Sequence, residues 1–233
     1  SISNINFDLL NYGRYNFEIP NFISLILTFL WISGIINAIN WIDGINGLSS
    51  GVVILILIGV AKIAYTKKLI SLFLITLILI GSCLGFLIHN LKPNNIIMGD
   101  NGSNFLGFNL AILCLYAGSD SDLYKENLSL MPLIPIFLLG FPCLDMVRVI
   151  YKRIRNKRSP FLPDKNHMHH LLLDLKFSNI KTILFIFSLT IYSISICFLF
   201  TDLNNKIIIF ILANLNLLLF LLISRRKLFI RTG

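Results

Sequence analysis

The sequence predicts an all-α, polytopic integral membrane protein, and three observations support this fold class. Of its 233 residues, 56% are hydrophobic and only 13% are charged, whereas soluble domains have roughly 45–50% apolar and 25% charged residues. The mean hydropathy is +0.80. Apolar stretches near the length that crosses a bilayer as a helix, about 20 residues, recur along the chain. We therefore expect about seven transmembrane helices plus one cytoplasmic amphipathic helix, in a single membrane domain spanning residues 1–233.

The expected spans follow one another from residue 21 onward. They cover residues 21–41, 52–65, 69–89, 104–118, 130–149, 182–200 and 207–223. The second and fourth are short, as expected if each begins at a buried polar site. The cysteines all lie in apolar runs without Cys-x-x-Cys spacing, which indicates small core residues rather than disulfides or metal ligands: Cys83, Cys114, Cys143 and Cys197.

The distribution of Lys and Arg orients these spans. If the loop after Asp43 faces the cytoplasm, twelve Lys and Arg lie on the cytoplasmic side and six on the other, as the positive-inside rule requires. Lys62, Lys67 and Lys68 run against the rule. The net charge of +9 therefore indicates membrane topology rather than nucleic-acid binding. The loops 43–51, 89–103 and 151–179 would share the cytoplasmic face of the inner (plasma) membrane.

The first polar cluster lies between Asn37 and Gly51. Polar residues recur in it at every third position, at Asn37, Asn40, Asp43 and Asn46. Residues three apart are neighbours on a helix, so the first three would form one oxygen-rich stripe. An interhelical hydrogen-bond seam is the alternative. A carboxylate at membrane depth costs roughly 2.5–3.5 kcal/mol and usually lines a functional cavity, which favours half of a polar site.

The second cluster is Met98-Gly-Asp-Asn-Gly-Ser-Asn104, directly before an apolar run. It predicts a Gly-Asp-Asn-Gly turn followed by Ser or Asn as the N-cap of a helix, whose free N–H groups can hold an anion. Asp100 in such a turn can also offer oxygen to Mg²⁺. An ordinary Asx turn at the end of a span is the alternative.

The third cluster lies in the basic loop 152–176, where Pro160 and Pro163 indicate an extended piece and Asp164 a helix cap. An apolar repeat then predicts an amphipathic helix on the membrane surface: Met168, Leu171, Leu172 and Leu175. Histidines occupy its first turns: His167, His169 and His170. We expect them to bind phosphate, because no cysteine or second histidine group lies nearby to complete a metal shell. A metal-binding tract and incidental surface histidines are the alternatives.

Asp145 and Arg148 close the fifth expected span. Their i,i+3 spacing suits a helical ion pair, and this alternative is at least as good as a role for Arg148 in substrate binding. Asp145 follows the apolar sequence Phe-Leu-Leu-Gly-Phe-Pro-Cys-Leu. An acid in such surroundings is costly unless it faces a site, so we expect Asp145 to face the site.

Taken together, the three clusters resemble one family, the polyprenyl-phosphate N-acetylhexosamine-1-phosphate transferases of glycosyltransferase family 4. Asn37-Ala-Ile-Asn-Trp-Ile-Asp43-Gly-Ile-Asn-Gly-Leu resembles the family's Asn-x-x-Asn-x-x-Asp-Gly-x-Asp-Gly-Leu motif. Met98-Gly-Asp-Asn-Gly-Ser is similar to its Gly-Asp-x-Gly-Ser motif, and His167-Met-His-His to its His-x-His-His motif. The segment Ser159-Pro-Phe-Leu-Pro-Asp resembles the branch that acts on UDP-N-acetylglucosamine or related sugars. The resemblance covers nearly the whole chain from about residue 20.

The resemblance implies an activity and a role for each motif residue. The family transfers a sugar-1-phosphate from a UDP-HexNAc to polyprenyl (undecaprenyl) phosphate with Mg²⁺, and releases UMP. It implies that Asp100 is the main metal ligand with Asn40, and Mn²⁺ is an alternative metal. The implied catalytic residues are Asp43, Asp100 and His169. The implied substrate-binding residues are Asn37, Asn46, Asp145, His167 and His170. A homodimer is left open.

Two departures from the family pattern matter. The family usually has Asp at the position of Asn46. It also carries an adjacent Asp-Asp pair several spans upstream, and this sequence has no Asp-Asp pair. We therefore expect the C-terminal portion of a longer transferase fold, or a truncated, non-catalytic membrane protein that binds polyprenyl phosphate or nucleotide sugar. A small transporter is a third alternative, which explains neither the histidines nor the Gly-Asp-Asn-Gly turn.

Overall fold

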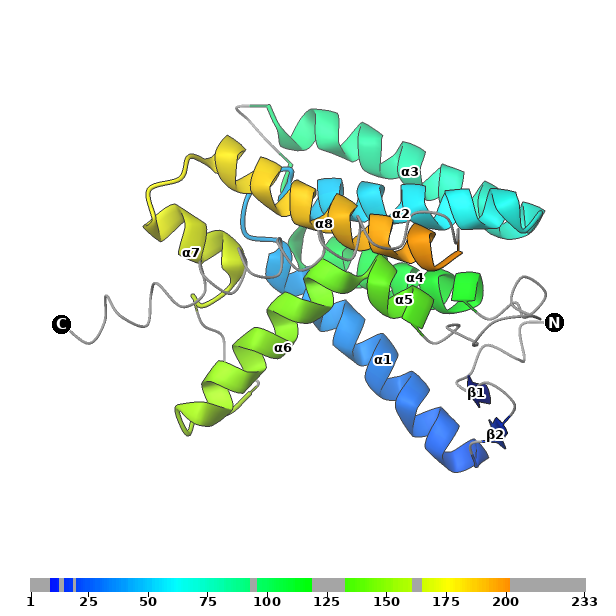
Figure 1. Cartoon of the computed structure of the whole chain (residues 1–233). Helices are drawn as coiled ribbons and strands as arrows, with labels where there is room; N and C mark the ends of the chain where they lie inside the picture. Colours follow the sequence, from blue (N-terminus) through cyan, green and yellow to red (C-terminus); the bar gives the residue numbers. More distant parts are fainter. Residues whose placement is uncertain are drawn as a thin grey trace.

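The computed structural model describes residues 9–12, 15–18, 20–92, 96–118, 133–160 and 165–201. The chain begins with an antiparallel hairpin, β1 (Leu9–Tyr12) and β2 (Tyr15–Glu18). The rest of the described chain is helical (Figure 1): α1 (Asn21–Ile42), α2 (Leu48–Thr66), α3 (Ile70–Asn90), α4 (Gly99–Gly118), α5 (Leu133–Leu138), α6 (Gly140–Arg155), α7 (Met168–Asp174) and α8 (Asn179–Thr201). The expected all-α membrane class is confirmed, and the short hairpin is an addition that the sequence analysis did not anticipate.

Within the described residues, four helices are long and apolar enough to cross a membrane. They are α1, α2, α3 and residues Asn179–Phe198 of α8, which match the spans expected at 21–41, 52–65, 69–89 and 182–200. The span expected at 207–223 lies outside the described residues. The number of seven spans therefore stays a prediction.

The two other expected spans form helices that are not among these four. The span expected at 104–118 is α4, which starts earlier, at Gly99. Its first turn is the polar sequence Gly-Asp-Asn-Gly-Ser-Asn, which lowers its hydropathy. Residues 130–132 of the span expected at 130–149 lie outside the described residues, and the rest of it is divided at Leu139 into α5 and α6. Pro142 explains the break, because proline has no N–H to donate to the carbonyl four residues earlier.

The helix α2 lies at the centre of the bundle (Figure 1). Of the 18-residue apolar stretch of α2 that could cross a membrane, 78% is buried, against 22% for the corresponding stretch of α1 and 17% for that of α3. Gly107 of α4 lies directly against the backbone of α1, since a Cβ placed on it would come within 2.8 Å of the Ile36 Cα. This close packing aligns the polar ends of α1 and α4.

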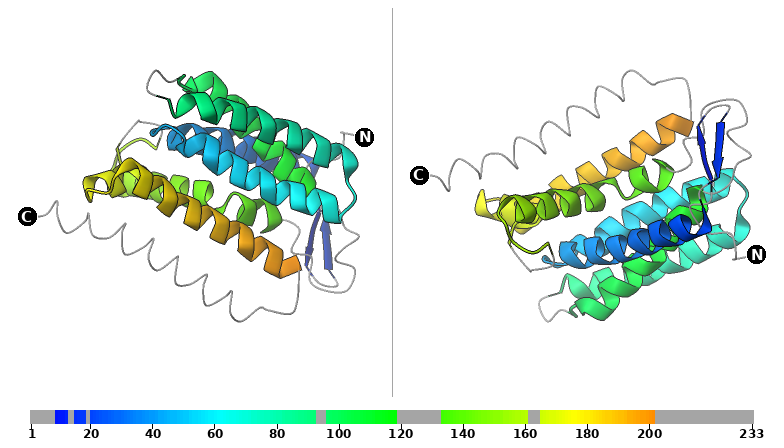
Figure 2. Two further views of the ribbon diagram at one scale, coloured as in Figure 1. Left: turned by 90° about the horizontal axis from the view of Figure 1, so that it is seen from above. Right: turned by 90° about the horizontal axis from the view of Figure 1, so that it is seen from below.

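Three segments lie at one end of the helix bundle: the α1–α2 turn, the residues that precede α4, and α7 (Figure 2). The β1–β2 hairpin and the α2–α3 turn lie at the opposite end. The three polar clusters therefore share one end, as the loop assignment predicted.

The structure corrects two local expectations at this end. The apolar residues Met168, Leu171 and Leu172 of α7 are at most 1% exposed, so this face packs inside the protein and not on the membrane surface. The helix has only seven residues, and its apolar face is filled by contacts such as those with α8. The proposed N-cap Ser103 lies inside α4, because that helix begins at Gly99. Asp164, the expected cap of α7, lies outside the described residues.

Candidate functional site

The first and second clusters meet where α1 ends and α4 begins. The Asn40 side-chain amide donates one hydrogen bond to Asp100 Oδ1, at 3.0 Å, and one to Ser103 Oγ, at 2.9 Å. Ser103 is fully buried, and its hydroxyl lies 3.1 Å from the Gly99 carbonyl and 3.2 Å from the Asp100 carbonyl. A residue pair 60 positions apart in sequence thus forms one polar surface, as the sequence analysis expected.

Asp43 stands beside this contact, at the C-cap of α1. Its Oδ1 accepts a 2.6 Å hydrogen bond from the Ser49 hydroxyl. Burial raises the pKa of Asp43 above its usual value; the Ser49 hydrogen bond opposes this rise, and the nearby Asp100 carboxylate adds to it. Among the described residues, neither carboxylate has an ion-pair partner.

These groups fit a magnesium ion. Mg²⁺ is bound through oxygen, commonly by one or two carboxylates together with water and substrate phosphates. Asp43 and Asp100 supply two carboxylates close enough to repel each other. The Asn40 amide nitrogen faces Asp100 and Ser103, so its oxygen is the atom left for a metal. No group of three or more His, Cys, Asp or Glu that could hold a metal occurs in the described part of the chain, so phosphate and water would complete the shell.

Asn90, at the end of α3, is a site residue that the sequence analysis missed. Its Oδ1 accepts a 2.6 Å hydrogen bond from the Gly47 N–H, and its amide donates to the Ile96 carbonyl at 2.7 Å. Gly47 has a φ of +81°, a conformation that favours glycine. Asn90 therefore fixes the turn after Asp43 relative to the segment before Asp100. An asparagine that ends an apolar span was the available signal.

Asn37 and Asn46 lie at the edges of this surface. Asn37 is exposed on α1 and donates to the Ser33 carbonyl at 2.8 Å. Asn46 is exposed in the α1–α2 turn. No hydrogen bond joins either side chain to Asp43 or Asp100 among the described contacts, so their roles in nucleotide binding stay predictions.

His169 brings the third cluster onto the first. Its side chain is only 2% exposed, and a Cβ added to Gly44 would overlap its ring. The pKa of His169 is lowered to about 4, chiefly by burial and secondly by the neighbouring His170. Its Nε2 is buried and has no hydrogen-bond partner among the described residues. A buried nitrogen without a hydrogen-bond partner, here beside Gly44, is costly unless a ligand binds to it.

The aromatic ring of Trp41 joins the same two clusters. It packs against the His167 ring, with centroids 5.3 Å apart, and the guanidinium of Arg153 lies 4.7 Å from its centroid. Arg153 is 2% exposed and donates to the Pro160 carbonyl. The sequence analysis gave neither Trp41 nor Arg153 a role, although a tryptophan within the first motif was visible.

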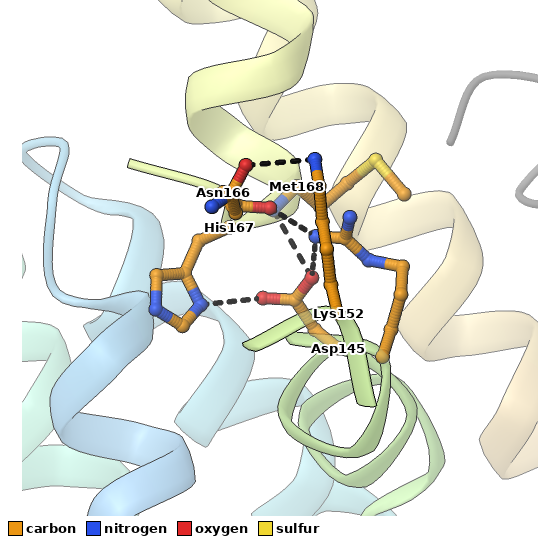
Figure 3. Close-up of polar contacts among 6 residues, drawn as sticks. Asp145, Lys152, Asn166, His167 and Met168 are labelled. Atoms are coloured by element: carbon orange, nitrogen blue, oxygen red, sulfur yellow. Dashed lines mark hydrogen bonds and ion pairs between the residues drawn. The ribbon is translucent and has the colours of Figure 1, made fainter. Parts of the chain in front are cut away.

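Asp145 belongs to α6, and its carboxylate faces His167 at the start of α7 (Figure 3). Its Oδ1 accepts from Arg148 at 2.7 Å and from the Met168 N–H at 3.0 Å, and its Oδ2 lies 3.0 Å from His167 Nδ1. At 2% exposure, the carboxylate faces protein donors. The expected Asp145–Arg148 ion pair is confirmed, and direct substrate binding by Asp145 stays a prediction.

The sequence of this chain is similar to that of known proteins. A family profile described as glycosyl transferase family 4 matches residues 2–118, which is half of the chain. The chain belongs to glycosyl transferase family 4. The matched residues include the Asn40, Asp43 and Asp100 site, whereas the histidines follow it.

Individual relatives of this family member come from several bacteria. A probable undecaprenyl-phosphate N-acetylglucosaminyl 1-phosphate transferase of Bacillus subtilis is 41% identical over 170 residues, covering 72% of this chain and 46% of the relative. A decaprenyl-phosphate N-acetylglucosaminephosphotransferase of Mycobacterium leprae is 36% identical over 183 residues, covering 70% and 45%. An undecaprenyl-phosphate alpha-N-acetylglucosaminyl 1-phosphate transferase of Escherichia coli K12 is 29% identical, covering 66% and 41%. The matched part thus spans less than half of each relative.

Proposed function

We propose that this family member takes part in transferring a HexNAc-1-phosphate from a UDP-sugar to polyprenyl phosphate, with release of UMP. The names of its relatives support this reaction. The observation that carries the proposal is the junction at Gly44, where His169 packs against the turn that follows Asp43. That junction unites an acidic surface, suited to a cation, with imidazoles suited to phosphate.

In the proposed site, Asp43 and Asp100 hold Mg²⁺, with Asn40 as an assisting ligand. The metal would neutralise negative charge on the diphosphate, which is what phosphoryl transfer chiefly requires. Asn40 also orients Asp100 through its amide hydrogen bond, and Ser49 orients Asp43. The chain's own residues thus set the positions of both carboxylates before a ligand arrives.

The histidines form the proposed phosphate side of the site. His167, His169 and His170 lie within one group of rings, with centroids 6.0 Å apart for the first pair and 4.1 Å for the second. The buried Nε2 of His169 is the nitrogen that gains most from a phosphate partner, because it has none among the described residues. Asn37 and Asn46 are proposed to line the nucleotide edge.

The proposed acceptor is a lipid, and the apolar helices suit it. Large apolar side chains are exposed along α1 and α3, Phe22, Phe29, Leu74 and Ile78 among them, which is the surface expected of helices in a bilayer. We propose that the site lies at the cytoplasmic face of the inner membrane, where UDP-sugars are available, and the count of Lys and Arg supports this orientation. A homodimer is also proposed, and the oligomeric state of the chain in detergent tests it.

The experiment is UMP release from UDP-N-acetylglucosamine in detergent with polyprenyl phosphate, with and without Mg²⁺. It is run on this chain, alone and joined to an N-terminal segment of the family that carries the Asp-Asp pair. Metal-dependent UMP from either preparation, abolished by Asp100→Asn, is the expected result. Asp174→Asn is the matched control, because it removes an exposed acid at the end of α7. UMP release that Asp100→Asn leaves unchanged would overturn the proposal.

A further inference from the structure

Both carboxylate oxygens of Asp145 face protein donors. Oδ1 accepts from Arg148 on α6 and from the Met168 N–H in the first turn of α7, and Oδ2 faces His167 Nδ1 (Figure 3). The same arginine also donates to the Asn166 carbonyl, while Lys152 donates to the Asn166 side chain at 2.8 Å. The segment before α7 is therefore tied to α6 through charged hydrogen bonds.

These contacts determine which nitrogen of His167 carries the proton. A carboxylate paired with an arginine is ionised, and it can only accept hydrogen bonds. The 3.0 Å contact therefore requires a proton on Nδ1. In the neutral ring this leaves Nε2 with its lone pair, since neutral imidazole has one donor and one acceptor nitrogen.

The fixed ring belongs to the candidate site rather than to a remote part of the fold. His167 packs against Trp41, which lies between the metal candidates Asn40 and Asp43 in sequence, and its ring is stacked 6.0 Å from that of His169. A rotation of the His167 ring would change both contacts. The orientation of the His167 ring thus determines which of its nitrogens can meet a ligand at the candidate site.

We propose that Asp145 is a positioning residue that holds His167 in the Nδ1–H tautomer and fixes its ring, so that Nε2 is the nitrogen left to meet a ligand. This inference rests on the proposed function for the identity of the ligand. The tautomer itself does not depend on activity, so it can be tested separately.

Asp145→Asn gives a specific result because of the geometry at Oδ1. The two donors Arg148 and Met168 N–H keep the amide oxygen on their side, which turns the amide nitrogen toward His167. Nδ1 must then accept, and the proton moves to Nε2. The variant keeps the shape of the side chain and reverses the tautomer.

The first arm of the test is ¹⁵N NMR of histidine-labelled chain in detergent, at a pH where imidazole is neutral. The four histidines are distinguished by the signal that His167→Gln removes. We expect the Nδ1–H form in the wild type and the Nε2–H form in Asp145→Asn, with Asp174→Asn unchanged. An Nε2–H form of His167 in the wild type overturns the proposal even if Asp145→Asn fails to fold.

The second arm measures UMP release. We expect Asp145→Asn to lower kcat by roughly 10–100-fold, the effect typical of removing the group that orients a functional histidine. In a His167→Gln background the same change should cost about twofold or less, because residues that act through one another are not additive. Equal losses in both backgrounds contradict the proposal. A wild type that shows the Nδ1–H form without any UMP release argues against the proposed function and leaves the positioning role supported.

Discussion

Two carboxylate sites lie at the same end of this protein, and they differ in how their charge is compensated. Asp43 and Asp100 have hydrogen bonds from Ser49 and Asn40, and neither has an ion-pair partner among the described residues. Asp145 is buried and meets an arginine, a histidine and a backbone N–H. The first site carries uncompensated negative charge that a cation would neutralise, whereas the second is complete without a ligand.

The difference separates ligand binding from positioning. Removing one partner of a buried ion pair is strongly destabilising because it leaves an uncompensated buried charge, whereas an exposed acid contributes little to stability. The Asp43–Asp100 pair is therefore the proposed binding surface, and Asp145 supports the histidines that complete it. Removing each acid in turn tests this contrast.

The largest expected effect comes from removing the compensated acid. Asp145→Ala leaves Arg148 without its carboxylate, and breaking a buried ion pair costs about 3–5 kcal/mol of folding free energy. Asp100→Ala removes an exposed acid and is expected to change stability by about 0.5 kcal/mol or less. Thermal unfolding of both variants in mild detergent measures the difference. Equal losses would mean that the two sites do not differ as described.

The second prediction concerns pH. The pKa of His169 is lowered from 6.5 to about 4 in the folded protein, chiefly by burial. Below pH 6.5 the unfolded chain binds a proton that the folded chain does not, so this contribution is full above that value and is lost as the pH falls toward 4. The loss is on the order of 3 kcal/mol at most. Thermal unfolding across this range should show a flatter profile for His169→Gln.

The matched control for this pH effect is His89→Gln. His89 is exposed near the end of α3, so its removal should leave the slope of the wild type. If His169→Gln does not alter the dependence of thermal unfolding on pH, His169 is not buried in its neutral form.

The third prediction concerns the α1–α4 contact that aligns Asn40 with Asp100. Gly107→Ala pushes its new methyl group against the backbone of Ile36, and overpacking of this kind costs about 1–3 kcal/mol. Gly81→Ala is the control, because a Cβ there meets nothing within 4 Å. Unfolding measurements should show a loss for the first variant only. A Gly107→Ala protein as stable as Gly81→Ala would argue against close α1–α4 packing.

The smallest expected effect is stabilisation by the metal. Mg²⁺ at ten times its Kd should stabilise the folded chain by about 1.4 kcal/mol. The shift in thermal unfolding should disappear in Asp100→Asn and persist in Asp174→Asn. A shift of equal size in Asp100→Asn would contradict the assignment of the metal to the α1–α4 site.

The sequence predicted the elements that depend on local pattern. The apolar runs at 21–41, 52–65, 69–89 and 182–200 all form helices that fit a membrane, because hydropathy and length alone determine such segments. The resemblance to the family had implied that Asn40 and Asp100 act together at one site, and the two side chains are hydrogen-bonded in the structure. The break at Leu139 was missed, although Pro142 provided a local signal for it.

The remaining parts depend on tertiary contacts that a single sequence does not contain. The repeat of Met168, Leu171 and Leu172 indicated an apolar helix face, but periodicity does not distinguish a face that meets lipid from one that meets α8. Asn90, Trp41 and Arg153 enter the site through partners more than 40 residues away or in another element. The donors that surround Asp145 come partly from the start of α7, so they are known only from the tertiary contact between this segment and α6.

The central claim is that the acidic surface and the histidine group form one binding site. The most direct measurement is calorimetric binding of UDP-N-acetylglucosamine to the purified chain in detergent, with and without Mg²⁺, for the wild type, Asp100→Asn and His169→Gln. We predict Mg²⁺-dependent binding that each substitution weakens roughly tenfold, the loss expected for one charged interaction. Binding that is independent of Mg²⁺ and unchanged in both variants would contradict the claim.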